Sequence, residues 1–136
     1  QMSNIKLRKE LSETATVVQG VEFKLQQVFL NIILNACDAM STGGWLSIAS
    51  WTDGESAVIE VADSGSGIAR EDLSRIYDPF FTTKDVGQGT GLGLSIAYGV
   101  IKEHGGTIGC QSGPGDGTRF TVTLPLQTQV RAVAQN

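Results

Sequence analysis

Four polar side chains share one side of a helix that the apolar periodicity predicts for residues 21–40. At about 100° per residue they fall in a stripe about 80° wide, and the rest is so apolar that a helix buried nearly all round is expected. The four are Gln27, Asn31, Asn35 and Asp38. Asparagine is a poor helix former, so two asparagines one turn apart on such a helix need polar partners. A cleft holding a cation and its ligand would supply them, whereas the alternative is an ordinary solvated face.

An acidic residue followed by two glycines stands where a predicted strand, residues 57–62, ends. In Asp63-Ser64-Gly65-Ser66-Gly67 the glycines permit a sharp turn and could bring backbone close to a flat ligand. An ionised carboxylate at the strand end could accept a hydrogen bond from an exocyclic amine. The alternative is a plain turn in which Asp63 caps the following short helix, and the D-x-G-x-G pattern by itself does not decide between the two.

Residues 87–94, Gly-Gln-Gly-Thr-Gly-Leu-Gly-Leu, form a glycine-dense segment that leads directly into an apolar helix. A helix N-terminus presents unpaired N–H groups and a positive dipole end, and glycine leaves room for phosphate oxygens. The segment is not a P-loop, because no Gly-Lys-Ser/Thr follows, and no strand leads into it as in a dinucleotide fingerprint. A flexible linker is the alternative, which the immediately following apolar helix disfavours.

The segment between these two motifs carries two aromatic residues and a lysine without periodicity, a pattern typical of a lid. It runs Asp-Pro-Phe-Phe-Thr-Thr-Lys over residues 78–84. Phe80 or Phe81 would anchor the base of the lid in the core, and Lys84 could reach a phosphate when the lid closes. The alternative is an exposed loop with a lysine that binds nothing.

These motifs must be held by a frame of strands and helices. The predicted strands cover residues 5–11, 14–18, 45–51, 57–62, 107–111 and 118–124, and the predicted helices cover 21–40, 70–76 and 92–104. A turn at Asp53-Gly54 makes 45–51 and 57–62 a hairpin. The expected fold class is α+β, a two-layer sandwich with a mixed, mostly antiparallel sheet of about five strands covered on one face by about three helices. We expect residues 1–126 to form the domain and residues 127–136 a tail or linker.

Composition and charge disfavour several classes of function. The net charge is −4, from 10 Lys plus Arg against 14 Asp plus Glu, and no basic run occurs, so nucleic acid is not an expected partner. Cys37 and Cys110 have no metal-ligand spacing, which favours free thiols and a cytoplasmic protein. The most apolar stretch, residues 28–36, is too short to span a bilayer, so no membrane contact is expected from this domain.

In this order, the motifs resemble the N, G1, F and G2 boxes of the catalytic domain of sensor histidine kinases. Residues 27–36 resemble the N box, 63–67 the G1 box, 78–81 the F box and 89–94 the G2 box. Residues 35–40 and 79–84 further resemble the branch that includes nitrogen-regulation and dicarboxylate sensor kinases. Each motif is weak alone, whereas four in order over nearly the whole chain are specific. The resemblance implies the ATP-binding fold that these kinases share with gyrase and heat-shock chaperones.

The resemblance implies a role for each motif in binding Mg-ATP. Asn35 would ligate a Mg²⁺ that bridges the triphosphate, with Asn31 beside it, and Lys84 would close over the phosphates as the third catalytic residue. Asp63 would bind the adenine amine, and Thr118 would help around the same ring. The implied nucleotide-binding residues are Asn35, Asp38, Asp63, Gly65, Gly67, Ile68, Phe80, Phe81, Thr83, Lys84, Gly89, Thr90, Gly91, Leu92, Gly93, Leu94 and Thr118.

The same resemblance implies a histidine protein kinase of a bacterial two-component system. The γ-phosphoryl group of ATP would pass to a histidine on a dimerisation domain absent from this chain, and a response regulator would act downstream. The single histidine, His104, precedes Gly105-Gly106 at a predicted helix end, where C-terminal capping is its expected role. We therefore expect a monomer that binds ATP without autophosphorylation and with little hydrolysis.

Two other functions stay open at this level. ATP-hydrolysing proteins of the same fold carry a glutamate at the position matching Asn31 to activate water, and an amide cannot take that proton near neutral pH. This difference favours phosphotransfer over hydrolysis. A degenerate domain that only binds another protein is the second alternative, and the intact nucleotide-contact positions count against it.

Overall fold

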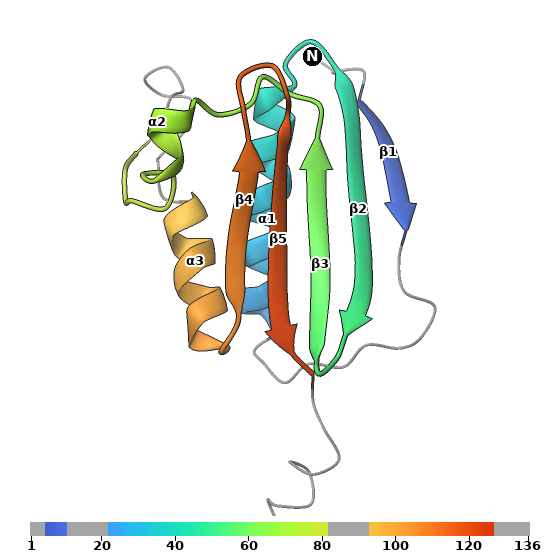
Figure 1. Ribbon diagram of the computed structural model, residues 1–136, viewed down its shortest axis with the longest axis vertical. Helices are drawn as coiled ribbons and strands as arrows, with labels where there is room; N and C mark the ends of the chain where they lie inside the picture. Colours follow the sequence, from blue (N-terminus) through green and yellow to red (C-terminus); the bar gives the residue numbers. More distant parts are fainter. Residues whose placement is uncertain (1–4, 11–21, 82–92, 127–136) are drawn as a thin grey trace, which may run out of the picture.

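Five strands form one sheet with helices on one of its faces (Figure 1). The computed structural model describes residues 5–10, 22–81 and 93–126. The strands are β1 (Ile5–Glu10), β2 (Gly44–Asp53), β3 (Ser56–Asp63), β4 (Thr107–Ser112) and β5 (Thr118–Pro125). The helices are α1 (Glu22–Ala39), α2 (Arg70–Leu73) and α3 (Gly93–Glu103). The predicted α+β two-layer sandwich is confirmed.

The sheet is mixed, as predicted, and its strand order is β1-β2-β3-β5-β4. β1 runs parallel to β2, whereas the other neighbouring strands pair antiparallel. β3 and β5 are distant in sequence but direct neighbours in the sheet, so Asp63 pairs with Thr118. This pairing brings two of the predicted nucleotide-binding residues to the same end of the sheet.

The hairpin predicted from the Asp53-Gly54 turn is present. β2 and β3 are joined through Gly54 and Glu55, and Gly54 has a φ of 63°, a left-handed conformation that glycine adopts without steric cost. Asp53 and Ser56 close the ladder as register partners. The hairpin thus sets the register that places Asp63 at the far end of β3.

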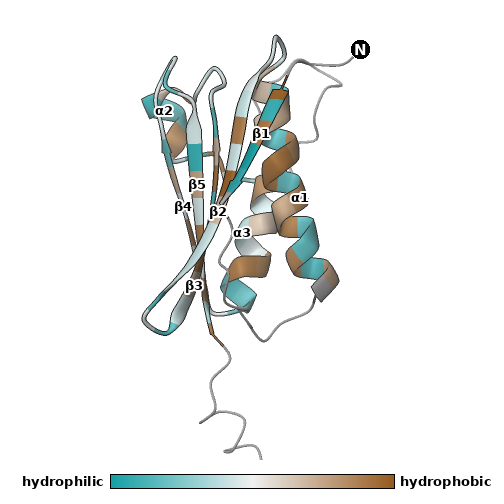
Figure 2. Ribbon diagram, turned by 90° about the vertical axis from the view of Figure 1, so that its right-hand side faces the viewer, coloured by the Kyte–Doolittle hydropathy of each residue, from teal (hydrophilic) through white to brown (hydrophobic). Residues whose placement is uncertain are grey.

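α1 and α3 pack against each other on the covered face of the sheet, and Figure 2 shows this layer in profile. Residues at intervals of four on α1 point into the core, together with side chains of α3 and the central strands. The buried members are Val28, Ile32, Ala36, Met40, Leu46, Val61, Ile76, Ala97, Ile101, Phe120, Val122 and Leu124. Full burial of each large apolar side chain stabilises the fold by about 1.5–3 kcal/mol. The helix pair is therefore fixed on the sheet by apolar packing.

The prediction that α1 is buried nearly all round is wrong. Leu30 is 48% exposed and Leu34 is 52% exposed, and Gln27 also lies at the surface. Because α1 belongs to the outer layer of a two-layer fold, only the side toward the sheet and α3 can be covered. The half-buried Asn31 and Asn35 therefore lie between a buried face of α1 and an exposed one.

The end of α3 has the C-terminal stop that the sequence predicts. Gly105 has a φ of 75°, and the N–H of Gly106 donates to the carbonyl oxygen of Ile101 at 3.0 Å. Nδ1 of His104 lies 2.7 Å from the carbonyl oxygen of Val100, and a carbonyl only accepts, so Nδ1 carries the proton. His104 therefore caps the helix end, as predicted.

Three predicted features lie outside the described residues: the strand at 14–18, most of the segment 78–91 and the tail at 127–136. Leu126, the last described residue, donates its N–H to the carbonyl oxygen of Glu55 at 2.8 Å. Among the helices in the described part of the chain, none is long and apolar enough to cross a lipid bilayer.

Candidate functional site

Asp63 ends β3 on the covered face of the sheet and is only 5% exposed. Its Oδ1 accepts a hydrogen bond from the backbone N–H of Gly65 at 2.7 Å, and the backbone N–H of Thr118 also bonds to the carboxylate. Burial raises the pKa of Asp63 above its ordinary value of 3.8, and these two hydrogen bonds partly oppose the rise. The carboxylate is therefore held in one position with little water around it.

The turn after Asp63 requires both of its glycines. A Cβ on Gly65 would lie 2.6 Å from the carbonyl oxygen of Ala39 at the end of α1. Gly67 has a φ of 81°, and a Cβ there would overlap the carbonyl oxygen of Gly113 in the β4–β5 turn. The predicted sharp turn is confirmed. The close approach seen in the structure is to protein backbone, whereas an approach to a flat ligand stays a prediction.

Ser112, which is not among the predicted site residues, is the centre of a hydrogen-bond network beside this turn. Its hydroxyl accepts from the backbone N–H of Ile68 at 2.8 Å and donates to the carbonyl oxygen of Gly117 at 2.7 Å. Its Oγ also lies 2.9 Å from Oγ1 of Thr118. One side chain thus ties the β3–α2 connection to the β4–β5 turn. The sequence offers a weak signal for this role, a serine before a Gly-Pro turn, and serine is common in turns.

The Ser112 network orients the hydroxyl of Thr118. A serine hydroxyl carries one hydrogen, and the hydrogen of Ser112 points to Gly117. Thr118 must therefore be the donor in its bond to Ser112, which leaves the lone pairs of Thr118 Oγ1 as acceptors. Since Asp63 is the register partner of Thr118, this end of the sheet presents two neighbouring acceptor groups.

Asn31 joins α1 to the first residue of α3. Its Nδ2 donates to the carbonyl oxygen of Gly93 at 3.1 Å, and its Oδ1 accepts from Nε2 of Gln27 at 2.8 Å. Asn35 lies one turn further along α1 and is half-buried, and Asp38 follows at an exposed position. The polar stripe of α1 therefore runs from the start of α3 toward the turn after β3, with Asn35 between them.

The two phenylalanines after Pro79 have different environments. Phe80 is 72% exposed and has a φ of 69°, which is uncommon for a residue other than glycine. Phe81 is half-buried and packs against the core, with the guanidinium carbon of Arg75 4.6 Å from its ring centroid. Of the two residues that could anchor this segment, Phe81 is therefore the one in contact with the core.

The structure brings together part of the predicted site. Asp63, Gly65, Gly67, Ile68 and Thr118 meet at one end of the sheet, and Asn31 meets Gly93. Leu94, the second residue of α3, packs against the core. Six predicted residues lie outside the described part of the chain, namely Thr83, Lys84, Gly89, Thr90, Gly91 and Leu92.

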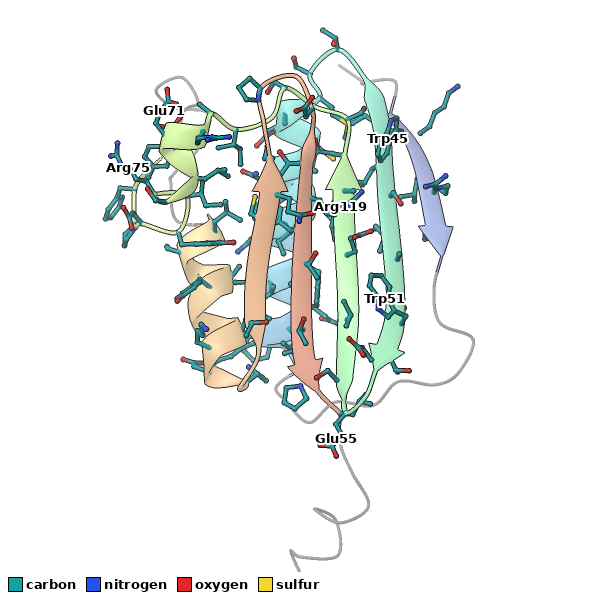
Figure 3. All side chains as sticks on the ribbon, viewed as in Figure 1. Trp45, Trp51, Glu55, Glu71, Arg75 and Arg119 are labelled. Carbon is teal, nitrogen blue, oxygen red and sulfur yellow. The ribbon has the colours of Figure 1, made fainter. Side chains whose placement is uncertain are left out.

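A hollow of about 410 Å³ opens on the other side of the sheet from this site. Its lining includes Trp45, Gln111 and Arg119, whose side chains alternate with those of the covered face. Figure 3 shows Trp45 and Arg119 on the face turned away from α1. The hollow also borders Asp63 and Thr118, but the carboxylate of Asp63 bonds to Gly65 on the covered side, so this hollow is not the cleft predicted for a nucleotide.

Comparison with known proteins assigns the chain to a family. Residues 20–128 match the family described as Histidine kinase-, DNA gyrase B-, and HSP90-like ATPase. Sporulation kinase C of Bacillus subtilis (strain 168) is 42% identical over 128 residues, which cover 93% of this chain and 29% of that protein. The catalytic domain of histidine kinase ThkA is 33% identical, with a TM-score of 0.78 over 90% of this chain and 79% of that chain. Full-length ShkA, solved in complex with AMPPNP, is 28% identical, with a TM-score of 0.76 over 91% of this chain and 26% of that chain.

The lengths covered by these matches show which part of each relative corresponds to this chain. The chain spans less than a third of sporulation kinase C but more than three quarters of the ThkA catalytic domain, so the similarity concerns one domain. Nucleotide binding is the common property of this family of ATPases. The chain belongs to the histidine kinase-, DNA gyrase B- and HSP90-like ATPase family, and it corresponds to the catalytic domain of a sensor histidine kinase.

Proposed function

We propose that this domain binds Mg-ATP and donates the γ-phosphoryl group to a histidine on a dimerisation domain of the same kinase. The observation that carries the proposal is the buried carboxylate of Asp63, whose bonds to the N–H groups of Gly65 and Thr118 leave acceptor capacity unused. A carboxylate has about four lone-pair sites. Because little water reaches this group, an amine donor that binds there gains a strong, charge-assisted hydrogen bond. The complex of the similar protein ShkA with AMPPNP, an ATP analogue, supports an adenine nucleotide as the ligand.

Adenine fits two neighbouring acceptors better than guanine does. The exocyclic amine of adenine is a donor, whereas guanine presents a carbonyl oxygen at the matching position. That oxygen would face the carboxylate of Asp63 and the lone pairs of Thr118, and acceptors repel each other. The same geometry therefore supports selection of adenine over guanine nucleotides.

The phosphates would extend along the polar stripe of α1 toward the start of α3. Lys84 and the backbone N–H groups of Gly89 to Gly93 would hold them there. In the described part of the chain, no three His, Cys, Asp or Glu residues form a cluster that could hold a metal on its own. Mg²⁺ typically binds through one or two protein oxygens plus substrate phosphates, so the amide oxygen of Asn35 fits as its protein ligand. Bound there, Mg²⁺ would neutralise phosphate charge.

In the transfer, the bond between the γ-phosphorus and the β,γ-bridging oxygen breaks, and a bond from that phosphorus to an imidazole nitrogen of the acceptor histidine forms. ADP leaves with the electron pair of the broken bond, and no water is consumed. The domain contributes position and charge neutralisation. The acceptor in this proposal lies on the dimerisation domain, whereas His104 caps the end of α3 through the bond of its Nδ1 to Val100.

ATP hydrolysis by the domain alone is the competing function, because hydrolysing ATPases belong to the same family. Activation of water needs a base, and the matching position holds Asn31, which cannot take a proton near neutral pH. Its Nδ2 acts as a hydrogen-bond donor to Gly93. These observations favour phosphotransfer over hydrolysis.

Calorimetric titration with ATP, GTP and adenosine, each with and without Mg²⁺, tests the binding step. We expect saturable ATP binding that Mg²⁺ strengthens, weaker binding of adenosine, and little binding of GTP. If no adenine compound binds under either condition, the domain is a protein-interaction module and the proposal is wrong.

Incubation with γ-labelled ATP tests the transfer step. The domain alone should release little phosphate, and the acceptor-helix domain of the parent kinase, supplied separately, should gain an acid-labile phosphohistidine. The yield should be low because the tether that raises the effective concentration is missing. His104→Gln should leave the yield unchanged. Rapid hydrolysis without the acceptor domain would favour the ATPase alternative.

The proposal extends to the partners of the whole kinase. A response regulator would take the phosphoryl group from the phosphohistidine, and the domain would work in the cytoplasm without a nucleic-acid partner or membrane contact. The isolated domain would be a monomer, which sedimentation velocity can check.

A further inference from the structure

Gln27 lies at the surface of α1, one helical turn before Asn31, and belongs to none of the proposed nucleotide contacts. Its Nε2 is 2.8 Å from Oδ1 of Asn31, and Nδ2 of Asn31 is 3.1 Å from the carbonyl oxygen of Gly93. Groups from two helices thus form a chain of two hydrogen bonds, here called the Gln27–Asn31–Gly93 relay.

The direction of both hydrogen bonds follows from the chemistry of the groups. The carbonyl of Gly93 only accepts, so Asn31 must present Nδ2 to it. An amide that presents Nδ2 on one side presents Oδ1 on the other, so the partner on that side must donate. Gln27 is that donor. The reverse orientation of the Asn31 amide would place Oδ1 against the Gly93 oxygen, and two acceptors repel each other.

The carbonyl of Gly93 also belongs to the first turn of α3. In an α-helix the carbonyl of residue i accepts from the N–H of residue i+4, which here is Ala97, a fully buried residue. A Cβ added to Gly93 would make ordinary van der Waals contacts with Cβ and Cγ of Asn31, each at 3.8 Å, so the side chain of Asn31 lies close beside the backbone of Gly93. The relay therefore fixes the first turn of α3 relative to α1.

The C-terminal end of α3 has a weaker polar link to α1. Nζ of Lys24 lies 3.5 Å from Oε1 of Glu103, and both side chains are largely exposed to solvent. An exposed ion pair contributes little to stability. The bond between Asn31 and Gly93 is half-buried, so it can contribute more to holding the start of α3 in place.

We propose that Gln27 is a positioning residue for nucleotide binding: by donating to Asn31, it selects the amide orientation that holds the start of α3. The inference rests on the proposed function, because the phosphates would bind where α3 begins. It adds to that function a residue that acts through Asn31 and does not touch the nucleotide.

Three substitutions at this exposed position separate the donor from the acceptor capacity of the side chain. Gln27→Lys keeps a donor, Gln27→Glu leaves acceptors only at neutral pH, and Gln27→Met removes both. All four residue types have similar helix propensities. Hydrogen exchange of the Ala97 amide in the nucleotide-free domain reports on the first turn of α3. We expect the Ala97 amide to exchange about fivefold faster in Gln27→Met than in the wild type. Exchange in Gln27→Glu should be at least as fast as in Gln27→Met, whereas exchange in Gln27→Lys should be close to the wild-type rate.

The expected order of exchange rates among the three variants distinguishes loss of the relay from a change in the stability of α1 alone. Lys24 lies one helical turn before Gln27, so a change in α1 stability alone would favour glutamate over lysine at this position and would rank the variants in the opposite order. In an Asn31→Ala background the three substitutions should no longer differ. The inference is overturned if Gln27→Met exchanges as slowly as wild type, or if Gln27→Lys exchanges as fast as Gln27→Met.

Calorimetry on Gln27→Met, which introduces no charge, connects the relay to the ligand. ATP affinity should fall about fivefold while adenosine affinity stays at the wild-type value, because the base end of the site lacks contact with the relay. Equal losses for both ligands would overturn the positioning role. If the wild-type domain binds no nucleotide, the proposed function fails, whereas the exchange of Ala97 still tests the relay itself.

Discussion

The hydroxyl oxygens of Ser112 and Thr118 lie 2.9 Å apart because the two residues are register partners on β4 and β5. The same serine holds Ile68 and Gly117, so one small side chain organises the backbone on both sides of the Asp63 turn. The acceptors proposed to bind adenine therefore depend on a residue that need not touch the base.

Ser112→Ala should lower the free energy of unfolding by about 1–3 kcal/mol, because polar groups of Ile68 and Gly117 lose their partner in a half-buried position. Adenosine affinity should fall as well, since the hydroxyl of Thr118 becomes free to rotate. Denaturant unfolding and calorimetry measure the two effects. Ser74→Ala, at an exposed position in the turn after α2, is the control and should change neither quantity. Wild-type behaviour of Ser112→Ala would show that the network is dispensable.

Asp63→Asn should change how both stability and binding depend on pH. Burial raises the pKa of Asp63 above 3.8, so the folded domain holds this proton more tightly than the unfolded chain does. The stability from this group is full below 3.8 and is lost as the pH rises through the higher pKa of the folded state. The substitution should remove that decline, as seen in unfolding curves at a series of pH values.

Nucleotide affinity of the wild type should show the reverse trend, since it should fall in acid as the carboxylate of Asp63 becomes protonated. Asp63→Asn should weaken the binding of ATP and ADP equally.

Gly67→Ala and Gly115→Ala form a matched pair that separates backbone strain from a steric clash. Both positions have nearly the same positive φ, 81° and 80°, but a Cβ would overlap the carbonyl oxygen of Gly113 at Gly67 and would meet nothing within 4 Å at Gly115. Gly115→Ala should cost about 1–2 kcal/mol of stability from φ alone. Gly67→Ala should cost clearly more and should also weaken adenosine binding. Equal costs for the two variants would mean that the approach to Gly113 does not matter.

Asn35→Ala tests the proposed Mg²⁺ ligand. Alanine is a better helix former than asparagine, so the unfolding temperature without ligand should stay equal or rise slightly. ATP affinity in the presence of Mg²⁺ should fall, whereas affinity in EDTA should match the wild type under the same conditions. If Mg²⁺ strengthens ATP binding to the variant as much as to the wild type, Asn35 does not ligate the metal.

Cys110 should be nearly inert toward thiol reagents in the folded domain. Burial, aided by the charge of Asp63, raises the pKa of Cys110 to about 12. At pH 8 this leaves roughly one thiolate in ten thousand molecules, and the thiolate is the reactive form. In a Cys37→Ser background, which leaves Cys110 as the single thiol, labelling should follow the rate of unfolding and accelerate in denaturant. Fast labelling under native conditions would contradict the burial described for this residue.

Elements defined by local periodicity were predictable from the sequence. The helix predicted for residues 21–40 is α1, Glu22–Ala39, because apolar residues spaced by four, such as Val28 and Ile32, specify a helix without knowledge of its neighbours. The stop at Gly105-Gly106 and the hairpin around Gly54 depend on glycine conformations that adjacent residues already imply. The same local patterns located Asp63 at the end of a strand and Asn31 on the polar stripe of a helix, where a ligand could bind.

The sequence by itself therefore determined the fold class, the family and most residues proposed for the site, since these follow from motifs read along the chain. Only the tertiary structure decided which segments meet. The pairing of β3 with β5 places Thr118 beside Asp63, and the packing of α3 on α1 brings Gly93 to Asn31. It also decided the roles of Ser112 and Gln27, because a serine or glutamine has no preferred partner until distant backbone groups are placed within hydrogen-bond distance. The spacing of residues along a chain specifies the period of a helix or strand, whereas contacts between distant segments are selected by how their apolar faces pack.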